Sequence, residues 1–212
     1  MKKYSAFLVL LIAISWSASA VNSFDRSAMY PYSKSFDSVG TAFEIASLLA
    51  PAILLGEQKS EYLTIGTIYA ETMLAAYGLK ELGKLCFQRA RPFMYFTDYP
   101  QTKVDEGDAY DSFPSGHVTM AFAGASFACS VFAAYHPDST WRLPVAVATY
   151  GFATATALLR VASGNHFMSD VLAGALIGTA VGLGIPFWHR KAGLTSFEAT
   201  VSPYALAFRI TL

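Results

Sequence analysis

Residues 114–135 read PSGHVTMAFAGASFACSVFAAY, a polar start followed by 18 uncharged residues, 118–135. Two later stretches, 143–159 and 171–188, are also uncharged and rich in Ala, Gly and Val. Their length suits either membrane-spanning helices or the buried helices of a compact bundle. Small residues permit close approach of helix backbones, as interfaces between membrane helices often require. The three stretches therefore predict three helices of an all-α fold.

Two further helical segments precede these three. The first, 38–56, is expected to kink at Pro51, and the second, 61–89, carries one polar face. Glu44 and Glu71 must face the bundle interior, because a mid-membrane carboxylate costs about 2.5–3.5 kcal/mol. Only 14% of the residues are charged, against about 25% in ordinary soluble domains. We therefore expect a compact helical bundle of about five core helices, embedded in a membrane, with a soluble periplasmic bundle as the alternative.

The N-terminus resembles a secretory signal. Two lysines precede a short apolar run, 6–14, and small residues follow at 18–20. A membrane span needs about 20 apolar residues, so this run predicts a cleaved leader, 1–20, and a mature chain that starts at Val21. Without the leader's two lysines, 13 basic and 15 acidic residues remain. This balance argues against nucleic acid as a partner, because nucleic-acid binding requires a basic patch.

The mature chain divides into one helical bundle, 21–193, and a C-terminal tail, 194–212. Within the tail, apolar residues alternate with other residues over 204–212, a period of two that predicts one short strand. The two cysteines, Cys86 and Cys129, fall on neighbouring helices at depths that differ by roughly 20 Å. That mismatch argues against a disulfide, so we expect two buried thiols that pack as small apolar groups.

Helix parity predicts the orientation of the bundle. If the mature N-terminus is exported, the ends of the second and fourth segments and the starts of the third and fifth share the outer side. The opposite side then receives Lys59, Arg142, Arg190 and Lys191, in agreement with the positive-inside rule. We therefore expect a bacterial inner-membrane protein whose site faces the periplasm. A soluble periplasmic or outer-membrane-associated protein is the alternative.

His166 and Asp170 are four residues apart, so on a helix they share one face. A carboxylate bonded to one imidazole nitrogen fixes the tautomer and leaves the other nitrogen free to act as a nucleophile or base. Arg160, six residues earlier, adds a planar set of donors suited to phosphate oxygens. The alternative is an ordinary hydrogen bond on a helix surface.

The polar start at 114–117 places Ser115, Gly116 and His117 at a helix N-terminus. Unpaired backbone amides at such a start bind anions, and glycine lets the anion come close. The alternative is a helix cap with an incidental histidine.

Lys84 and Arg91 are seven residues apart and lie on one helix face, before Pro92 ends that helix. They form either a solvated basic edge, to which Arg89 also belongs, or part of a site with Arg160. In the second case three unneutralised cations meet in one cleft, and a bound phosphoryl dianion relieves their repulsion.

The order Lys-x6-Arg-Pro, Pro-Ser-Gly-His and Arg-x5-His-x3-Asp, over residues 84–170, resembles the signature of the type 2 phosphatidic acid phosphatase superfamily. That superfamily includes lipid phosphate phosphatases, bacterial class A acid phosphatases and vanadium haloperoxidases. The resemblance implies hydrolysis of a phosphate monoester through a phosphohistidine, with no metal and no cofactor. It implies that His166 attacks, Asp170 orients it and His117 acts as acid and base. The implied phosphate-binding residues are Lys84, Arg91, Ser115, Gly116 and Arg160.

The implied substrate is a phosphorylated lipid or a small phosphate ester. A soluble non-specific acid phosphatase, a vanadate-dependent haloperoxidase and a non-catalytic binder of phosphorylated ligands are the alternatives. Leu159 stands where the superfamily usually has serine, so one phosphate-directed hydroxyl is missing. The loop 93–111 is expected either to rim the pocket or to be a solvated connector. His136 and His189 are expected to lie at a turn and a helix end, without ligand partners.

Overall fold

The computed structural model describes residues 21–56, 61–191, 197–202 and 205–210. All five expected helices are present. The first is α3 with a 3-10 helix, η1, directly after it, and the others are α4, α6, α7 and α8. Their bounds are α3 Lys34–Leu48, η1 Ala50–Gly56, α4 Tyr62–Phe87, α6 Gly116–Tyr135, α7 Arg142–Ala162 and α8 Met168–Lys191. Four short elements complete the bundle: α2 Ser23–Arg26, η3 Pro92–Tyr95, α5 Gln101–Asp105 and η4 Asp108–Tyr110.

Pro51 marks a change of helix type. The α-helix α3 ends at Leu48, and Pro51 lies in the tighter turns of η1. Proline lacks the amide hydrogen that an α-helix needs at this point, so the expected kink takes the form of a helix end followed by a 3-10 segment.

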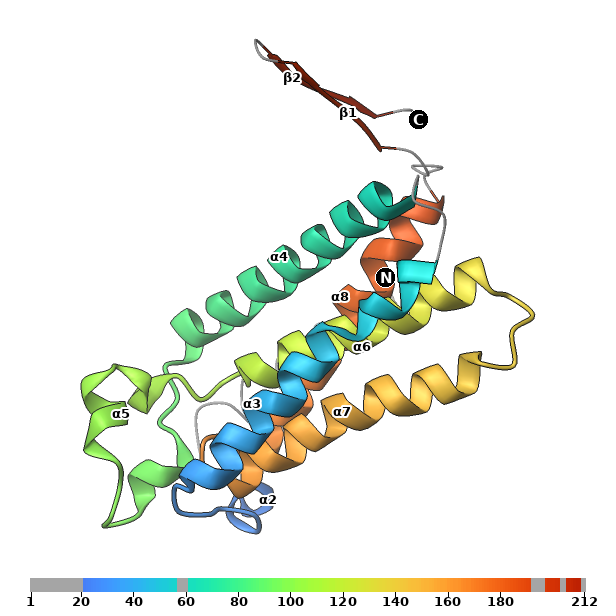
Figure 1. Cartoon of the computed structure of the whole chain (residues 1–212). Coiled ribbons are helices and arrows are strands. Elements are labelled where there is room, and N and C mark those ends of the chain that lie inside the picture. The colour runs from blue at the N-terminus through green and yellow to red at the C-terminus, as the bar shows by residue number, and fades with distance from the viewer. Residues whose placement is uncertain (1–20, 57–60, 192–196, 203–204, 211–212) are drawn as a thin grey trace, which may run out of the picture.

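Helix α6 lies at the centre of the bundle and contacts α3, α4, α7 and α8 (Figure 1). Three glycines of α8 bring its backbone against that of α6. A Cβ atom added at Gly178 or Gly182 would lie 2.3 or 2.5 Å from a carbonyl oxygen of α6, and one at Gly174 would lie 2.7 Å from the carbonyl oxygen of the N-cap residue. Only glycine permits this approach, which is typical of packing between membrane helices. The contact fixes the starts of α6 and α8 relative to each other.

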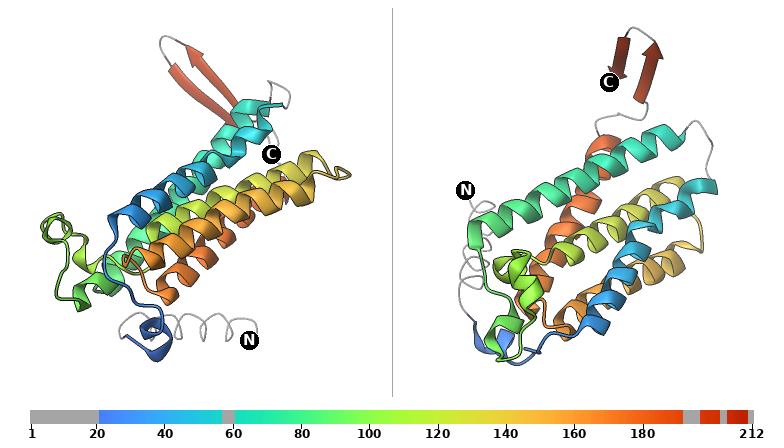
Figure 2. Two further views of the ribbon diagram at one scale, coloured as in Figure 1. Left: turned by 60° about the horizontal axis from the view of Figure 1, so that its bottom comes forward. Right: turned by 60° about the vertical axis from the view of Figure 1, so that its left-hand side comes forward.

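One end of the bundle gathers the starts of α3, α6 and α8 and the ends of α4 and α7, together with the connection that carries α5 (Figures 1 and 2). The three sequence motifs all fall at this end. The alternating directions of the predicted helices placed the three motifs at one end of the bundle, and the structure confirms this arrangement.

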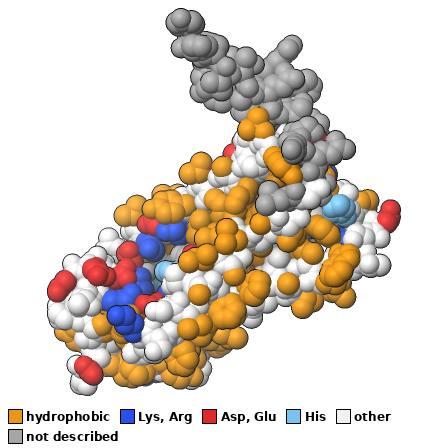
Figure 3. Space-filling model, in the orientation of Figure 1, with side chains coloured by type: hydrophobic (Ala, Val, Ile, Leu, Met, Phe, Trp, Pro, Cys, Tyr) orange, Lys and Arg blue, Asp and Glu red, His pale blue; other side chains and the backbone are white. Residues whose placement is uncertain are grey.

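Apolar side chains cover much of the face drawn in Figure 3. Among the described residues, four helical stretches are long and apolar enough to cross a membrane, namely 34–54, 116–135, 142–162 and 168–191. Large apolar side chains on the outside include Leu74 and Leu85 of α4 and Leu143 of α7, each more than 70% exposed. So broad an apolar surface is unusual for a soluble monomer and suits contact with lipid.

Three expectations about single residues need correction. Cys86 is exposed rather than buried, whereas Cys129 is half-buried with its thiol 3.1 Å from Thr149 Oγ1, and both are free thiols. Glu71 does not face the bundle interior: it is exposed on α4, and its Oε2 lies 2.6 Å from His189 Nε2 at the end of α8. His189 thus has a carboxylate partner, which its position at a helix end did not predict.

The tail forms a hairpin rather than a single strand. Strand β1 (Phe197–Ser202) pairs with β2 (Ala205–Ile210) in antiparallel register, with Phe197 opposite Ile210. The expected strand corresponds to β2, and β1 supplies a partner that the alternation did not reveal. The predicted leader, 1–20, lies outside the described residues.

Candidate active site

A cavity of about 510 Å³ opens at the end of the bundle where the motifs meet. In Figure 3 it is the hollow where basic and acidic side chains gather around a histidine. Six of the eight predicted site residues line it: Lys84, Arg91, Gly116, His117, Arg160 and His166. The other two, Ser115 and Asp170, are fully buried next to lining residues. The structure therefore brings all three motifs to one place.

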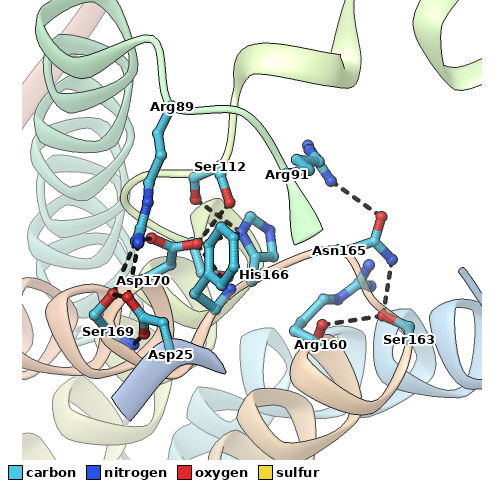
Figure 4. Close-up of polar contacts among 12 residues, drawn as sticks. Asp25, Arg89, Arg91, Ser112, Arg160, Ser163, Asn165, His166, Ser169 and Asp170 are labelled. Atoms are coloured by element: carbon cyan, nitrogen blue, oxygen red, sulfur yellow. Dashed lines mark hydrogen bonds and ion pairs between the residues drawn. The ribbon is translucent and has the colours of Figure 1, made fainter. Parts of the chain in front are cut away.

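His166 lies in the turn between α7 and α8 and is only 1% exposed. Its Nδ1 is 2.8 Å from the backbone carbonyl oxygen of Ser112, which accepts the ring proton (Figure 4). A proton on Nδ1 leaves the lone pair of Nε2 available. Because the ring lines the cavity, a neutral imidazole here can act as a nucleophile or a base toward a bound group.

Asp170 reaches His166 less directly than the four-residue spacing predicted. Its Oδ2 lies 3.8 Å from His166 Nδ1, which is beyond hydrogen-bond range. Oδ2 instead accepts hydrogen bonds from Ser112 Oγ at 2.6 Å and from the Phe167 amide at 2.8 Å. The carboxylate thus holds Ser112, whose carbonyl orients the imidazole. The spacing argument assumed a helix through both residues, but α8 begins only at Met168.

Each predicted phosphate-binding cation already has a carboxylate partner. Arg160 binds Asp37 of α3, and Arg91 Nη2 lies 3.2 Å from Asp108 Oδ1. Lys84 Nζ is 3.6 Å from Asp111 Oδ2. The expectation of three unneutralised cations is therefore wrong. The carboxylates hold the cations in place before any anion arrives.

The surroundings of Arg91 and Asp108 shift both of their pKa values. Burial lowers the pKa of Arg91, and Asp108 opposes that effect only in part. Burial by itself would raise the pKa of Asp108, but Arg91 and Lys103 outweigh it and hold that pKa below its ordinary value. Asp108 is therefore a carboxylate at neutral pH, a partner for both Arg91 and Lys103.

The loop 93–111 does rim the pocket. Lys103 and Asp108 line the cavity, and Lys103 Nζ lies 3.3 Å from both Asp37 Oδ2 and Asp108 Oδ2. Both residues belong to the loop that was expected to rim the pocket, but no motif contains them, so their ion pairs were not predicted. Sequence reasoning also missed Lys80, Thr41 and the apolar part of the lining. That part consists of Leu48, Tyr77 and Met120.

The start of α6 leaves two polar groups available to a ligand. Ser115 is the N-cap residue, but its hydroxyl makes no capping bond, and within the described part of the chain that buried oxygen has no hydrogen-bond partner. His117 Nε2 lies 3.6 Å from Glu44 Oε2 across the cavity, so Glu44 faces the interior as expected.

Leu159, which stands where the superfamily usually has serine, lies beside Gly40 of α3. Among the residues that the structure describes, no cluster of three His, Cys, Asp or Glu side chains could hold a metal ion.

Acid should destabilise the fold through His166. Burial, Arg91 and Arg160 lower its pKa well below the ordinary value, and the Ser112 carbonyl offsets this only partly. Below pH about 6.5 His166 takes up a proton in the unfolded chain but stays neutral in the folded protein. Folding is therefore less favourable as the pH falls, by up to about 1.4 kcal/mol per pH unit. Thermal unfolding in detergent should show that His166→Gln loses less stability than the wild type between pH 7 and 5.5. Parallel losses would contradict the low pKa.

Comparison with known proteins places this geometry in a family. Residues 65–194 match the profile of the PAP2 superfamily. A lipid A 1-phosphatase from Porphyromonas gingivalis is 35% identical over 106 residues, which cover 50% of this chain and 19% of that protein. A probable diacylglycerol pyrophosphate phosphatase from Schizosaccharomyces pombe is 32% identical over 103 residues, which cover 43% of this chain and 37% of that protein. The matches thus span about a fifth and about a third of these relatives.

Two solved structures share the fold. A transmembrane PAP2-type phosphatidylglycerolphosphate phosphatase from Bacillus subtilis superposes with a TM-score of 0.62 at 17% identity, covering 90% of this chain and 98% of that one. Aquifex aeolicus LpxE superposes with a TM-score of 0.56 at 22% identity, covering 79% of this chain and 96% of that one. The profile match extends over more than half of the sequence, and the apolar helices agree with a membrane location. The protein is therefore a membrane-embedded member of the PAP2 superfamily.

Proposed function

We propose that the protein is a phosphatase that hydrolyses the phosphate monoester or diphosphate of a lipid through a phosphohistidine on His166. The observation that carries this proposal is the orientation of His166: its Nδ1 is held by the Ser112 carbonyl while the ring lines a cavity with Arg91 and Arg160. A neutral imidazole beside fixed cations is suited to attack on a phosphoryl group.

In the proposed reaction, His166 Nε2 attacks phosphorus as the bond to the ester oxygen breaks. His117 gives its proton to the departing oxygen and then takes one from water. That water attacks the phosphohistidine, breaks the P–N bond and releases inorganic phosphate and neutral His166. The side chains of Lys84, Arg91, Arg160 and Ser115 and the Gly116 amide hold the other phosphoryl oxygens. These groups supply the charge stabilisation that the transition state needs.

The shape of the cavity supports a lipid substrate. Its lining combines the cations Arg91 and Arg160 with Leu48, Tyr77 and Met120 from α3, α4 and α6. An amphiphile fits such a mixed lining, with its phosphate against the cations and its chain against the apolar side chains. The relatives and structural neighbours named for lipid A, diacylglycerol pyrophosphate and phosphatidylglycerolphosphate support the same class.

We further propose that the cavity faces the periplasm from the inner membrane. Arg142 at the start of α7 and Arg190 and Lys191 at the end of α8 lie at the end of the bundle away from the cavity. Basic residues favour the cytoplasmic side, which supports this orientation.

Lipid phosphates should be hydrolysed far better than soluble esters. Burial of even four methylene groups contributes about 3 kcal/mol, so kcat/KM for a lipid should exceed that for p-nitrophenyl phosphate by about 100-fold. Phosphate release is measured with detergent-purified protein on phosphatidic acid, phosphatidylglycerol phosphate, a polyprenyl diphosphate, lipid A and p-nitrophenyl phosphate. Activity should persist in EDTA. Equal rates on all substrates would favour a non-specific acid phosphatase, and complete loss in EDTA would contradict the mechanism.

A further inference from the structure

The segment 22–33 lies against the turn that carries His166; we call it the N-terminal strap. Its amide at Ser33 donates a hydrogen bond to the Ser163 carbonyl at 3.1 Å. Gly164 has φ +71°, and a Cβ atom there would lie 2.5 Å from the Tyr30 carbonyl oxygen. Only glycine combines that backbone conformation with so close a contact. The strap and the turn are therefore in direct contact, and Figure 1 shows α2 of the strap at the end of the bundle where α3 starts.

The strap places one carboxylate, that of Asp25, inside the protein. Asp25 is fully buried, and its oxygens accept hydrogen bonds from the Ser169 amide at 2.9 Å and the Ser169 hydroxyl at 2.8 Å. A third hydrogen bond comes from Arg89 Nη2 at 2.7 Å (Figure 4). A buried carboxylate is tolerated only when it is paired in this way. Asp25 thus ties the strap to Arg89 and to the first turn of α8.

Arg89 links this carboxylate to the site. It is 6% exposed, and its Nη1 lies 2.5 Å from Asp170 Oδ1 while its Nη2 binds Asp25. The guanidinium also lies over the Phe167 ring, 4.2 Å from the ring centre. Arg89 therefore bridges two buried carboxylates, that of Asp25 in the strap and that of Asp170, which accepts the Ser112 hydrogen bond.

This sharing decides which atoms Asp170 has available. Arginine prefers to bind one carboxylate through two parallel hydrogen bonds. Because Asp25 occupies Nη2, Arg89 contacts only Oδ1 of Asp170, and Oδ2 remains with Ser112 and the Phe167 amide. Without Asp25, Arg89 could take both oxygens of Asp170 and release Ser112. The Ser112 carbonyl would then no longer fix the ring of His166.

We propose that Asp25 is a positioning residue for the phosphatase reaction, acting through Arg89, Asp170 and Ser112 on the orientation of His166. The proposal rests on the proposed function, because it takes His166 as the nucleophile. Asp25 lies outside the three sequence motifs, Arg89 occupies an unspecified position of the first motif, and neither residue lines the cavity.

The test uses the full chain with Asp25→Asn, purified in detergent. At metal sites, loss of a partner that orients a ligand lowers activity about 10- to 100-fold, and kcat should fall by a comparable factor here. KM should stay within about twofold, because the cations that hold phosphate are unchanged. The rate of phosphoenzyme formation with an activated ester should fall in parallel with kcat. The control, Asp138→Asn, neutralises an exposed carboxylate in the connection between α6 and α7 and should keep the wild-type kcat.

A double variant tests the route through Arg89. If Asp25 acts through Arg89, Asp25→Asn should slow an Arg89→Met protein no further, because effects along one chain of contacts are not additive. Multiplied losses would overturn the proposal. So would a wild-type kcat for Asp25→Asn, or a rise in KM with kcat unchanged.

Two further variants cover the remaining outcomes. If Asp25→Asn does not fold, Ser169→Ala removes the hydroxyl that contacts both Asp25 and Arg89, and it should lower kcat several-fold without changing KM. An unchanged kcat in Ser169→Ala would overturn the proposal. His166→Ala separates the proposed function from the proposed role of Asp25. Phosphatase activity in His166→Ala refutes the proposed function. If His166→Ala is inactive and Asp25→Asn is fully active, only the role of Asp25 is refuted.

Discussion

The His166→Ala variant is expected to release no phosphate above background from any ester. Without the imidazole there is no nucleophile to accept the phosphoryl group, and the cations alone leave only the slow attack of water. Loss of a nucleophile typically lowers kcat by about 10⁶-fold. Phosphate release and trapping of a labelled phosphoenzyme both measure this loss, and the labelled band should disappear.

A second histidine variant separates the two proposed roles. His117→Ala should slow turnover yet still form a phosphoenzyme with an activated ester, whose leaving group needs no proton. The control, His136→Ala, changes a histidine at the far end of α6 and should keep wild-type activity. Phosphoenzyme in His166→Ala, or none in His117→Ala, would assign the nucleophile elsewhere.

The Gly178→Ala variant is expected to lose several degrees of thermal stability. A Cβ atom at this position would lie 2.3 Å from the Thr119 carbonyl oxygen and 2.9 Å from the Ala123 amide nitrogen, so α8 must move away from α6. Forcing an extra methyl group into a packed interface costs about 1–3 kcal/mol. Thermal unfolding in detergent measures the loss. Activity should fall as well, because His117 lies in the first turn of α6 and Asp170 in the first turn of α8.

Gly184 provides a matched control on the same helix. A Cβ atom there would meet nothing within 4 Å, so Gly184→Ala should leave stability unchanged or raise it by about 0.5–1 kcal/mol, since alanine favours helix. If both variants unfold at the same temperature, the close contact between α6 and α8 does not contribute as described.

The helices could be predicted because their signal is local and repeated. Three uncharged stretches of bundle length have few other structures available, and helix parity alone placed the motifs at one end. The motifs then identified the lining residues Arg160 and His166, because residues that bind one phosphate must converge. Pro51 marked a real change in α3, although the α-helix ended instead of bending.

The partners of the site residues could not be predicted in the same way. Asp37 and Asp108 pair with Arg160 and Arg91 across 123 and 17 residues, and nothing in their local sequence marks them as partners. Arg89 was predicted to belong to a solvated basic edge, yet it is buried and paired with Asp25, 64 residues earlier in the chain. Long-range pairing of charges depends on tertiary packing, and a single sequence carries no period or spacing that reports it.

The carboxylates beside Arg91, Arg160 and Lys84 have a consequence for how an anion is received. In the proposed reaction, an arriving phosphate meets cations that already have carboxylate partners, so its binding exchanges one anion for another instead of neutralising unpaired positive charge. The same carboxylates compete with orthophosphate once the ester bond is gone. The pocket is thereby built against tight retention of its product, and vacating it restores the ion pairs that were there before.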